Sequence, residues 1–493
     1  MGDYAVPESI RKMKPKGTMV KKLKNGYYVY NFENYTDEKG KRKTRSLGCI
    51  GKITADLGFV PNNSYLLKAT KTCYEYGQYA LAFAASKNVL TTLESVFNKQ
   101  DAYRMYFHAL LQVVNQYTGA TKIETDFEQS YLSMNYPSIS MTYYSVTSLL
   151  DDLGRKQTKV IEFEQTLIDE AEEIAVDGHV IRTESDENDL SEYGYKYPEL
   201  KAPQMNLLMG YDTKRKRPVF SRMFQGNSLD KVSFKELLDR YQYKDILFLI
   251  DRGFTDEKNF EIIDNYDCNY IIPSSQNLED YKNITKDQKF NGRFIFETIN
   301  KDKKKEGQIV YYKEIEYGGK RVFLFKNMTT NNKDQFSYLS NLAKYPETYS
   351  EEEFEEQKDW FGTVVLRTNL PKEKADADYV YCAYKRRWRI ETFYNYLKNG
   401  MEFSGIQAED YYKIQGLSFI VLISGLIHAE LVNKVKLLKG YSVDNVLREF
   451  RALKLGFQNG HWTFFNESKK LYNMMKKIDF DCYKDLSKLN SKL

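Results

Sequence analysis

The sequence predicts a mixed α/β protein built around one central sheet. Residues 174–181, 204–211 and 217–224 are three successive apolar runs of strand length, as expected for buried strands. A helical pattern follows at 233–241. The next run, at 245–254, is apolar at neighbouring as well as alternate positions, which places this fourth strand in the middle of the sheet with both faces covered.

Three strands, a helix and a fourth strand in this order indicate a ribonuclease-H-like core. A helix at 256–266 and a fifth strand at 268–273 continue the core pattern. After a more polar stretch, residues 362–369 again form an apolar run typical of a buried strand, and a long helix begins near Asp376. The sequence therefore predicts a core in two segments, separated by an insertion.

The other segments differ from this core in texture. Residues 26–32 and 43–51 alternate as a β-hairpin does, with a turn at 37–40. The segment after them is rich in Ala, Leu and Tyr at helical spacing, and the insertion alternates as strands do. The predicted domains are a basic β-rich module at 1–65, a helical region at 66–170, the core at 171–276 and 361–435, a β-rich insertion at 277–360 and a C-terminal helical region at 436–493.

Length and charge bound the function. At 493 residues the chain is too long for a single hydrophobic core. Residues 1–50 hold twelve Lys and Arg against five Asp and Glu, a balance of +7, whereas the whole chain carries only +5. A basic module on a near-neutral body fits a polyanionic partner such as nucleic acid. On charge alone, a basic tail kept for solubility is an equal alternative.

Several classes of protein are excluded by what the sequence lacks. The five cysteines lie far apart without a CxxC pair, which argues against a disulfide framework or a cysteine zinc site. The longest apolar stretch, Gly416 to Ile427, is too short for a bilayer of ~30 Å, and the N-terminus has no apolar signal region. No phosphate-binding G-x-x-x-x-G-K-[ST] motif occurs. We therefore expect a cytoplasmic protein, without a membrane span, that is not an ATP-driven motor.

Two aspartates stand near predicted strand ends. Asp177 lies towards the end of the first core strand, and Asp251 ends the fourth. Adjacent parallel strands would hold these carboxylates side by side, where their mutual repulsion calls for a cation. Taken alone, an aspartate at the end of a strand is more often a turn former or a helix cap.

The helix that begins near Asp376 carries a charged stripe beside its apolar face. At about 100° per residue, four residues share an arc of roughly 60°; they are Tyr384, Arg387, Glu391 and Lys398. The apolar face consists of Ile390, Phe393, Tyr394 and Leu397. One carboxylate could therefore lean over the strand ends. The plain alternative is an exposed helix with ordinary Arg–Glu pairing four residues apart.

The spacing Tyr-x2-Arg-x3-Glu-x6-Lys at 384–398 resembles, at all four positions, the YREK signature of bacterial insertion-sequence DDE transposases (the insertion sequence family four superfamily). Asp251-Arg252-Gly253-Phe254 matches the second acidic motif of that group, Asp-x-Gly-Phe/Tyr, and Asp177-Gly178 matches the first. The resemblance covers about residues 170–430, and the interval between 251 and 391 leaves room for the β-rich insertion of that group.

The resemblance implies a role for each matched residue. The residues implied to hold two Mg²⁺ ions, with Mn²⁺ able to substitute, are Asp177, Asp251 and Glu391. Those implied to grip phosphates beside the cut are Tyr384, Arg387 and Lys398. The basic residues implied to bind terminal inverted repeats are Lys41, Arg42, Lys43 and Arg45. The helical region 66–170 would add further DNA contacts.

Two positions depart from the pattern of the group. His179 stands where a small hydroxyl residue is expected; a direct metal role and a structural, hydrogen-bonded role are both open, and the structural one is favoured. The group commonly stacks a flipped base on a tryptophan of the insertion, and the only candidate at its edge is Trp360.

Together these features indicate a DDE transposase that performs cut-and-paste transposition. Its expected partners are double-stranded DNA, as terminal inverted repeats and target, and a second copy of the chain in the synaptic complex. We expect it in the bacterial cytoplasm, associated with the nucleoid. The alternatives are a catalytically inactive DNA-binding relative and a metal-dependent nuclease of the same fold.

Overall fold

The computed structural model forms two compact units, each assembled from segments distant in sequence. One unit comprises residues 1–81, 126–140 and 445–493, and the other comprises 82–125 and 141–444. The residues that the structure describes are 6–36, 40–56, 58–62, 73–116, 119–183, 188–192, 203–254, 256–274, 279–287, 289–299, 304–399, 405–406, 408, 410–458 and 461–491. The domain boundaries given above remain a prediction.

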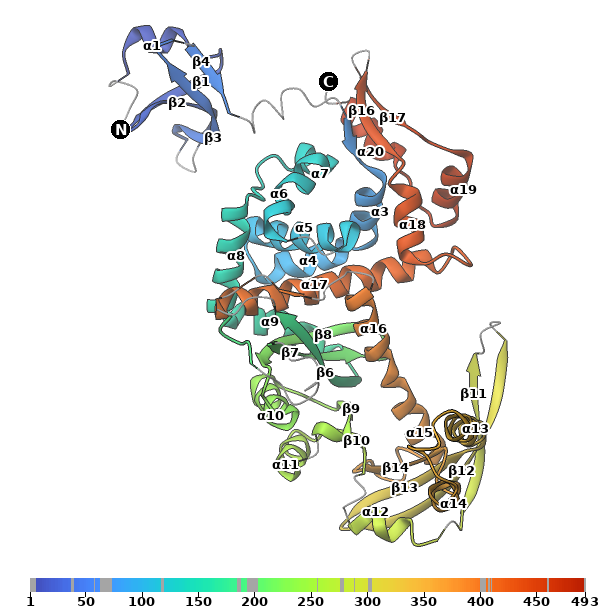
Figure 1. The fold of residues 1–493 in the computed structure, drawn as a ribbon. Helices are drawn as coiled ribbons and strands as arrows, with labels where there is room; N and C mark the ends of the chain where they lie inside the picture. Colours follow the sequence, from blue (N-terminus) through green and yellow to red (C-terminus); the bar gives the residue numbers. More distant parts are fainter. Residues whose placement is uncertain are drawn as a thin grey trace. The chain divides into compact units, whose positions relative to one another are not determined.

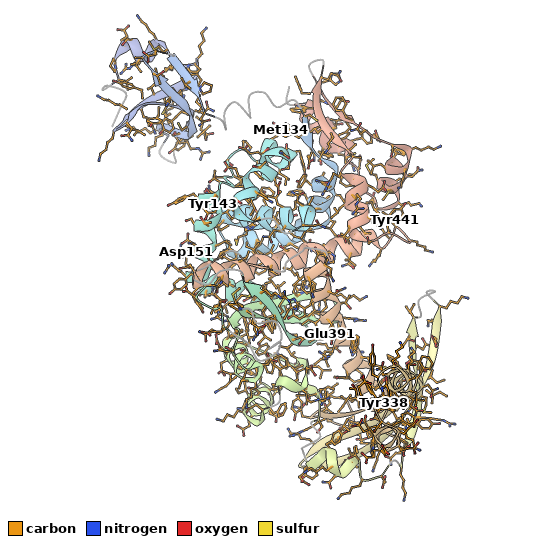
Figure 2. All side chains as sticks on the ribbon, in the orientation of Figure 1. Met134, Tyr143, Asp151, Tyr338, Glu391 and Tyr441 are labelled. Atoms are coloured by element: carbon orange, nitrogen blue, oxygen red, sulfur yellow. The ribbon has the colours of Figure 1, made fainter. Side chains whose placement is uncertain are left out.

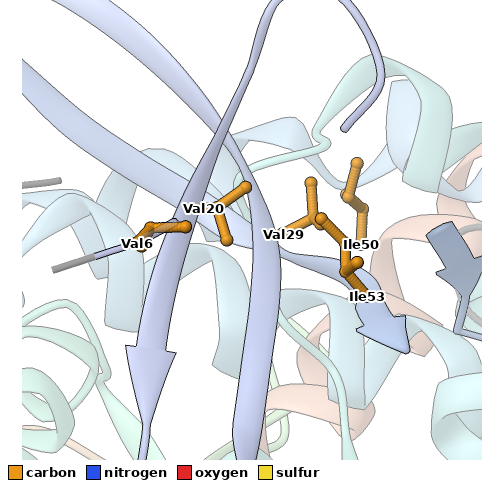
Figure 3. Close-up of a cluster of buried hydrophobic side chains, with 5 residues drawn as sticks. All are labelled: Val6, Val20, Val29, Ile50 and Ile53. Atoms are coloured by element: carbon orange, nitrogen blue, oxygen red, sulfur yellow. The ribbon is translucent and has the colours of Figure 1, made fainter. Parts of the chain in front are cut away.

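The N-terminal module is a small antiparallel sheet. Its elements are α1 (Glu8–Lys12), β1 (Thr18–Leu23), β2 (Gly26–Thr36), β3 (Arg42–Thr54) and β4 (Gly58–Pro61), and the strands pair in the order β1-β2-β3-β4. Five side chains form its core, namely Val6, Val20, Val29, Ile50 and Ile53 (Figure 3). The predicted hairpin is confirmed as β2–β3, flanked by two strands that were not predicted. Most of the predicted turn, at 37–39, lies outside the described residues.

A run of helices follows the first strand of a second small sheet. The helices are α3 (Gly77–Ala85), α4 (Lys87–Val96), α5 (Lys99–Asn115), α6 (Ala120–Gln129), α7 (Tyr131–Asn135), α8 (Tyr143–Arg155) and α9 (Gln157–Asp169). The small sheet has the order β17-β16-β5 and consists of β5 (Cys73–Glu75), β16 (Lys454–Gln458) and β17 (His461–Phe465). The segment 436–493, expected to be helical, thus also contains a hairpin beside α18 (Val443–Phe450), α19 (Lys469–Lys477) and α20 (Tyr483–Asn490).

In the central sheet the strands lie in the order β8-β7-β6-β9-β10 (Figure 1), consistent with the predicted ribonuclease-H-like core. Its strands are β6 (Glu173–Thr183), β7 (Gln204–Asp212), β8 (Arg217–Gln225), β9 (Leu247–Ile250) and β10 (Asn269–Pro273). The strand β9 is fully buried and pairs in parallel with β6 on one side and β10 on the other. Its central position, predicted from apolar residues on both faces, is confirmed. The accompanying helices are α10 (Asp230–Arg240) and α11 (Glu257–Asn265).

The insertion continues the same sheet. The strand β14 (Thr363–Thr368) pairs with β10 on one edge and with β13 (Lys320–Asn327) on the other. Beyond it follow β12 (Lys305–Tyr317) and β11 (Gly292–Ile299), all antiparallel. The insertion is less uniformly β than expected, because it also holds α12 (Glu279–Ile284), α13 (Met328–Lys344) and α14 (Glu351–Gln357).

The most apolar helix is α17 (Tyr411–Val435), which packs against α5, α8 and β8. It is longer than the apolar stretch noted in the sequence: by length and composition it could cross a membrane, and 89% of its most apolar window is buried inside the protein. Two glycines allow α8 and α17 to touch. A Cβ on Gly154 would lie 1.9 Å from the Tyr412 carbonyl oxygen, and one on Gly416 would lie 2.1 Å from that of Leu150.

The long helix expected from Asp376 is divided in two. Asp376 caps α15 (Ala377–Arg386) by accepting a hydrogen bond from the Tyr379 N–H, as sequence suggests for a helix start. The second helix, α16 (Trp388–Asn399), begins after Arg387. The Arg387 N–H donates to the Tyr384 carbonyl, three residues back, so the turn tightens at this point. The apolar face predicted on α16 is confirmed as buried.

Glu164 in α9 gives this unit a predicted pH dependence. Its carboxylate accepts hydrogen bonds from the Ser221 N–H (3.0 Å) and the Tyr241 hydroxyl (2.6 Å). Burial raises the pKa of Glu164 to about 7 from an ordinary value of 4.5, against the hydrogen bonds, which lower it. The folded state therefore holds this proton more tightly than the unfolded chain does, and the resulting stability is present below about pH 4.5 and lost as the pH rises through 7.

We expect Glu164→Gln to raise the free energy of unfolding at pH 8 by on the order of 2 kcal/mol, and therefore to raise the urea midpoint at that pH. At pH 5 the substitution should change the free energy of unfolding little. The measurement is urea unfolding of both proteins at the two pH values. An equal change at pH 5 and pH 8 would contradict the assignment.

Candidate active site

Two carboxylates follow the last paired residues of adjacent parallel strands. The pairing of β6 with β9 ends at Val176 opposite Ile250, so Asp177 and Asp251 come next on each strand. The Asp177 Oδ1 accepts the N–H of Gly178 (2.9 Å), and the Asp251 Oδ1 accepts that of Arg252 (2.7 Å). Each carboxylate is thus oriented by the backbone that follows it.

The placing of Asp177 within its strand differs from expectation. The strand β6 runs on to Thr183, because it remains paired with β7 after β9 has ended, and Asp177 lies opposite Met209 in that pairing. Asp177 therefore marks the end of the parallel pairing and not the end of the strand. The sequence could not show this, because the length of a strand depends on how far its neighbours extend.

The α15–α16 junction brings Arg387 and Glu391 to these carboxylates; Figure 2 labels Glu391 on α16. The Arg387 Nη2 donates to the Glu391 Oε1 at 2.7 Å, and the Arg387 Nη1 lies 3.9 Å from the Asp177 Oδ2. Burial alone would lower the pKa of Arg387, but the negative charges of Asp251, Asp177 and Glu391, together with Tyr384, raise it. All three acidic residues of the predicted site thus surround one guanidinium group.

Tyr384 joins this group, whereas Lys398 does not. Burial raises the pKa of Tyr384, with Arg387 opposing the rise and Asp251 adding to it. Lys398 is exposed in the last turn of α16. It lies seven residues beyond Glu391, about 10 Å along the helix axis. A shared helical arc did not bring Lys398 to the carboxylates, because separation along the axis matters as much as direction around it.

His179 lies in an aromatic stack next to the site. Its ring stacks on that of Tyr394, with ring centroids 5.0 Å apart and an interplanar angle of 18°. The Tyr394 hydroxyl in turn donates to the Asp177 carbonyl oxygen at 2.6 Å. Tyr394 was expected only as a buried apolar residue, and its bond to the strand that carries Asp177 was missed.

A buried ion pair holds the helix junction to the start of β6. The Glu173 side chain, 1% exposed, accepts hydrogen bonds from the Arg386 Nε (2.8 Å) and Nη2 (2.5 Å). The Thr213 hydroxyl donates to the same carboxylate. Sequence reasoning missed this pair, since nothing in the local pattern relates a glutamate at the start of a strand to an arginine in a distant helix.

The side chains of the site suit a divalent cation in their chemistry, because three carboxylates supply the hard oxygen ligands that Mg²⁺ prefers. Their present arrangement is different. Among the residues that the structure describes, no group of three His, Cys, Asp or Glu side chains lies close enough together to hold a metal ion. The buried guanidinium of Arg387 stands among the carboxylates instead.

A cavity of about 750 Å³ adjoins Asp251 through the next residue, Arg252, which lines it. The tryptophan singled out in the sequence, Trp360, lines the same cavity, with Tyr281 and Phe361. Trp388, the first residue of α16, is instead 59% exposed. Of these two tryptophans, Trp360 alone lines this cavity.

The basic residues predicted on the N-terminal hairpin lie at the start of β3 and are exposed; they are Lys41, Arg42, Lys43 and Arg45. The Arg45 guanidinium pairs with the Glu33 carboxylate across β2 and β3, at 2.5 Å. Its charge is therefore partly neutralised.

Comparison with known proteins gives a family match and a similar solved structure. Residues 169–424, more than half of the chain, match the family described as "Transposase DDE domain". Among solved structures, the cryo-EM structure of a piggyBac transposase synaptic complex with hairpin DNA aligns with 11% sequence identity and a TM-score of 0.39, covering 76% of this chain and 78% of that chain. No curated protein matches the sequence.

Proposed function

Since this chain belongs to the transposase DDE-domain family, we propose that it is an insertion-sequence transposase of the YREK group, which cleaves DNA at transposon ends and joins them to target DNA. The Tyr-Arg-Glu-Lys spacing at 384–398 supports the assignment to that group.

One observation carries the proposal. Asp177 and Asp251 follow the last residue pair of adjacent parallel strands and lie near the Arg387 guanidinium. Glu391 contacts this guanidinium from helix α16. The three acidic motifs are far apart in sequence, so an incidental cap or surface ion pair would not bring them together. A decayed relative would have no reason to keep all three.

The proposed roles follow from what each side chain can do. Asp177, Asp251 and Glu391 would hold the divalent metal ions that transposases of this family use; we propose two Mg²⁺ ions, replaceable by Mn²⁺. When bound, such ions supply an activated water or DNA 3′-OH and stabilise the leaving oxygen. Arg387 and Tyr384 would bind the phosphate beside the cut, where a guanidinium can donate two parallel hydrogen bonds. Lys398 would contact the backbone further along the DNA.

The test uses DNA from the two ends of the element that encodes the chain, with Mg²⁺ and a supercoiled target plasmid. Cleavage at a defined inverted-repeat end, followed by joining of the 3′-end to the plasmid, is the expected result. Cleavage without joining would favour the nuclease alternative. Binding of the ends with neither reaction would favour the inactive DNA-binding alternative.

The basic residues of β3 are proposed to contact the phosphates of the inverted repeats. Changing Lys41, Arg42 and Lys43 together to glutamine should weaken binding of any duplex and reduce the slope of log K against log salt by up to about 3, one unit per lost phosphate contact. Arg45→Gln removes a single charge of the same strand and should reduce the slope by less than about 1, because the Glu33 carboxylate already pairs with Arg45. Fluorescence anisotropy from 50 to 300 mM salt would measure both, and equal slopes in all variants would contradict the proposal.

We further propose that the protein acts as a homodimer on paired DNA ends in the bacterial cytoplasm, at the nucleoid. Light scattering of the complex with end DNA would show two protein chains for two ends. A complex of one chain with one end throughout the reaction would exclude the dimer.

A further inference from the structure

The guanidinium of Arg387 occupies an unusual place, since it is buried among three carboxylates that are themselves partly exposed to solvent. The Arg387 side chain is 7% exposed, whereas those of Asp177 and Glu391 are 20% and 37% exposed. One nitrogen donates to Glu391, another lies near Asp177, and Asp251 adds its negative charge. This single cation therefore interacts with all three acidic groups of the site and offsets one of their three negative charges.

Arg387 is also incompletely bonded. A guanidinium offers five N–H donors, yet the Nε and Nη1 of Arg387 are buried and have no hydrogen-bond partner among the described residues. Buried polar groups are normally paired. These two nitrogens carry three of the five N–H donors, which suits a group that has another partner in a different state, and a DNA phosphate can accept such bonds in pairs.

A divalent ion and this guanidinium need the same negative charges. Placing both among Asp177, Asp251 and Glu391 would bring like charges together in a partly desolvated site, where repulsion is strong. An ion can approach through the partly exposed carboxylates, but the guanidinium already occupies the Glu391 Oε1 and lies 3.9 Å from the Asp177 Oδ2.

Resting on the proposed function, we propose that Arg387 is a built-in counter-cation which holds the three carboxylates in the DNA-free protein and suppresses metal binding there. It is released to a DNA phosphate when the transposon end arrives, and the carboxylates then become available to the metal. Metal affinity and DNA binding are thereby coupled, each favouring the other. A protein of this kind binds its metal ions more tightly on DNA than in the DNA-free state.

The test measures Mn²⁺ binding to the DNA-free full chain, from the electron paramagnetic resonance signal of free Mn²⁺. Arg387→Gln removes the charge, and Arg387→Met removes it while keeping an unbranched apolar side chain. Both variants should bind Mn²⁺ at least about tenfold more tightly than wild type. Arg387→Lys, which keeps the charge, should stay close to wild type. Circular dichroism and the shift of the melting temperature on adding Mn²⁺ would show that each variant is folded and binds the ion.

Arg389→Gln is the matched control, because it makes the same charge change two residues further along the chain, while the Arg389 guanidinium donates to the Thr213 carbonyl. It should leave the Mn²⁺ affinity unchanged. Adding Asp177→Asn to Arg387→Gln should abolish the gain if the ion binds at this site. Equal Mn²⁺ affinity in wild type and the charge-free variants, or an equal gain in Arg389→Gln, would overturn the proposal.

The two proposals can fail separately. A tighter Mn²⁺ site in Arg387→Gln, in a protein that neither cleaves nor joins DNA, would leave the counter-cation in place and remove the transposase activity. Normal cleavage and joining by wild type, with no change in Mn²⁺ affinity in the variants, would support the transposase activity and exclude Arg387 as a counter-cation.

Discussion

Glu391→Gln is expected to lower the rate of DNA cleavage by at least about 10³-fold while DNA binding persists. Glutamine has the shape of glutamate, and its carbonyl oxygen can still accept the hydrogen bond that Arg387 now donates at 2.7 Å. What is lost is the negative charge that α16 contributes beside the two strand-borne aspartates, and with it a proposed metal ligand. The measurement is single-turnover cleavage of a labelled transposon end, with a gel-shift titration of the same DNA.

Glu355→Gln makes the same chemical change on the exposed helix α14, where Glu355 pairs with Lys358 three residues away, and this variant should cleave at the wild-type rate. Equal rates for Glu391→Gln and wild type would remove Glu391 from the mechanism. Loss of binding together with cleavage would assign Glu391 to holding Arg387 in place.

Glu173→Ala is expected to lower the free energy of unfolding of the unit that contains residues 141–444 by about 3 kcal/mol. This is the second large effect that we predict. The Glu173 carboxylate is buried and receives two hydrogen bonds from Arg386 and one from the Thr213 hydroxyl. Its removal leaves a largely buried guanidinium without its partner. The melting temperature should fall by several degrees, and the neighbouring Arg387 should lose its fixed place among the carboxylates.

Glu172 provides the control, since it precedes Glu173 but is exposed, so Glu172→Ala should change stability little. A double-mutant cycle with Arg386→Ala would isolate the pair. If Glu173→Ala and Arg386→Ala had additive effects, the ion pair would not be the source of the stability.

The core was predictable because its signals are local. The strand β9 is apolar on both faces, which placed it between two neighbours, and the two aspartates followed from its adjacency to β6. The helices of the insertion were not predicted, because the segments beside them alternate between apolar and polar residues, a pattern typical of strands. The hairpin β16–β17 could have been predicted, because the sequence has an Asn-Gly pair at 459–460, and such a pair is typical of a two-residue hairpin turn.

The site was predictable as a set of residues but not as an arrangement. The break at Arg387 has no proline or glycine to announce it, and it follows from the contacts of two helices with one sheet. The same holds for Glu173 and Arg386, which meet across more than two hundred residues of chain. Spacing motifs identify which groups belong together, whereas the partner that each group has in the absence of DNA depends on packing.

The continuous sheet from β8 to β11 limits how this architecture can change in evolution. The strand β14 joins β10 to β13 by hydrogen bonds on both of its edges. Loss of β11, β12 and β13 would leave β14 with a bare edge of unpaired N–H and C=O groups, a ready template for aggregation. A shortened descendant would therefore have to cover that edge or end the sheet at β10. Lengthening of the insertion meets no such barrier, because new strands can be added beyond β11 without disturbing the pairing of the strands that carry the carboxylates.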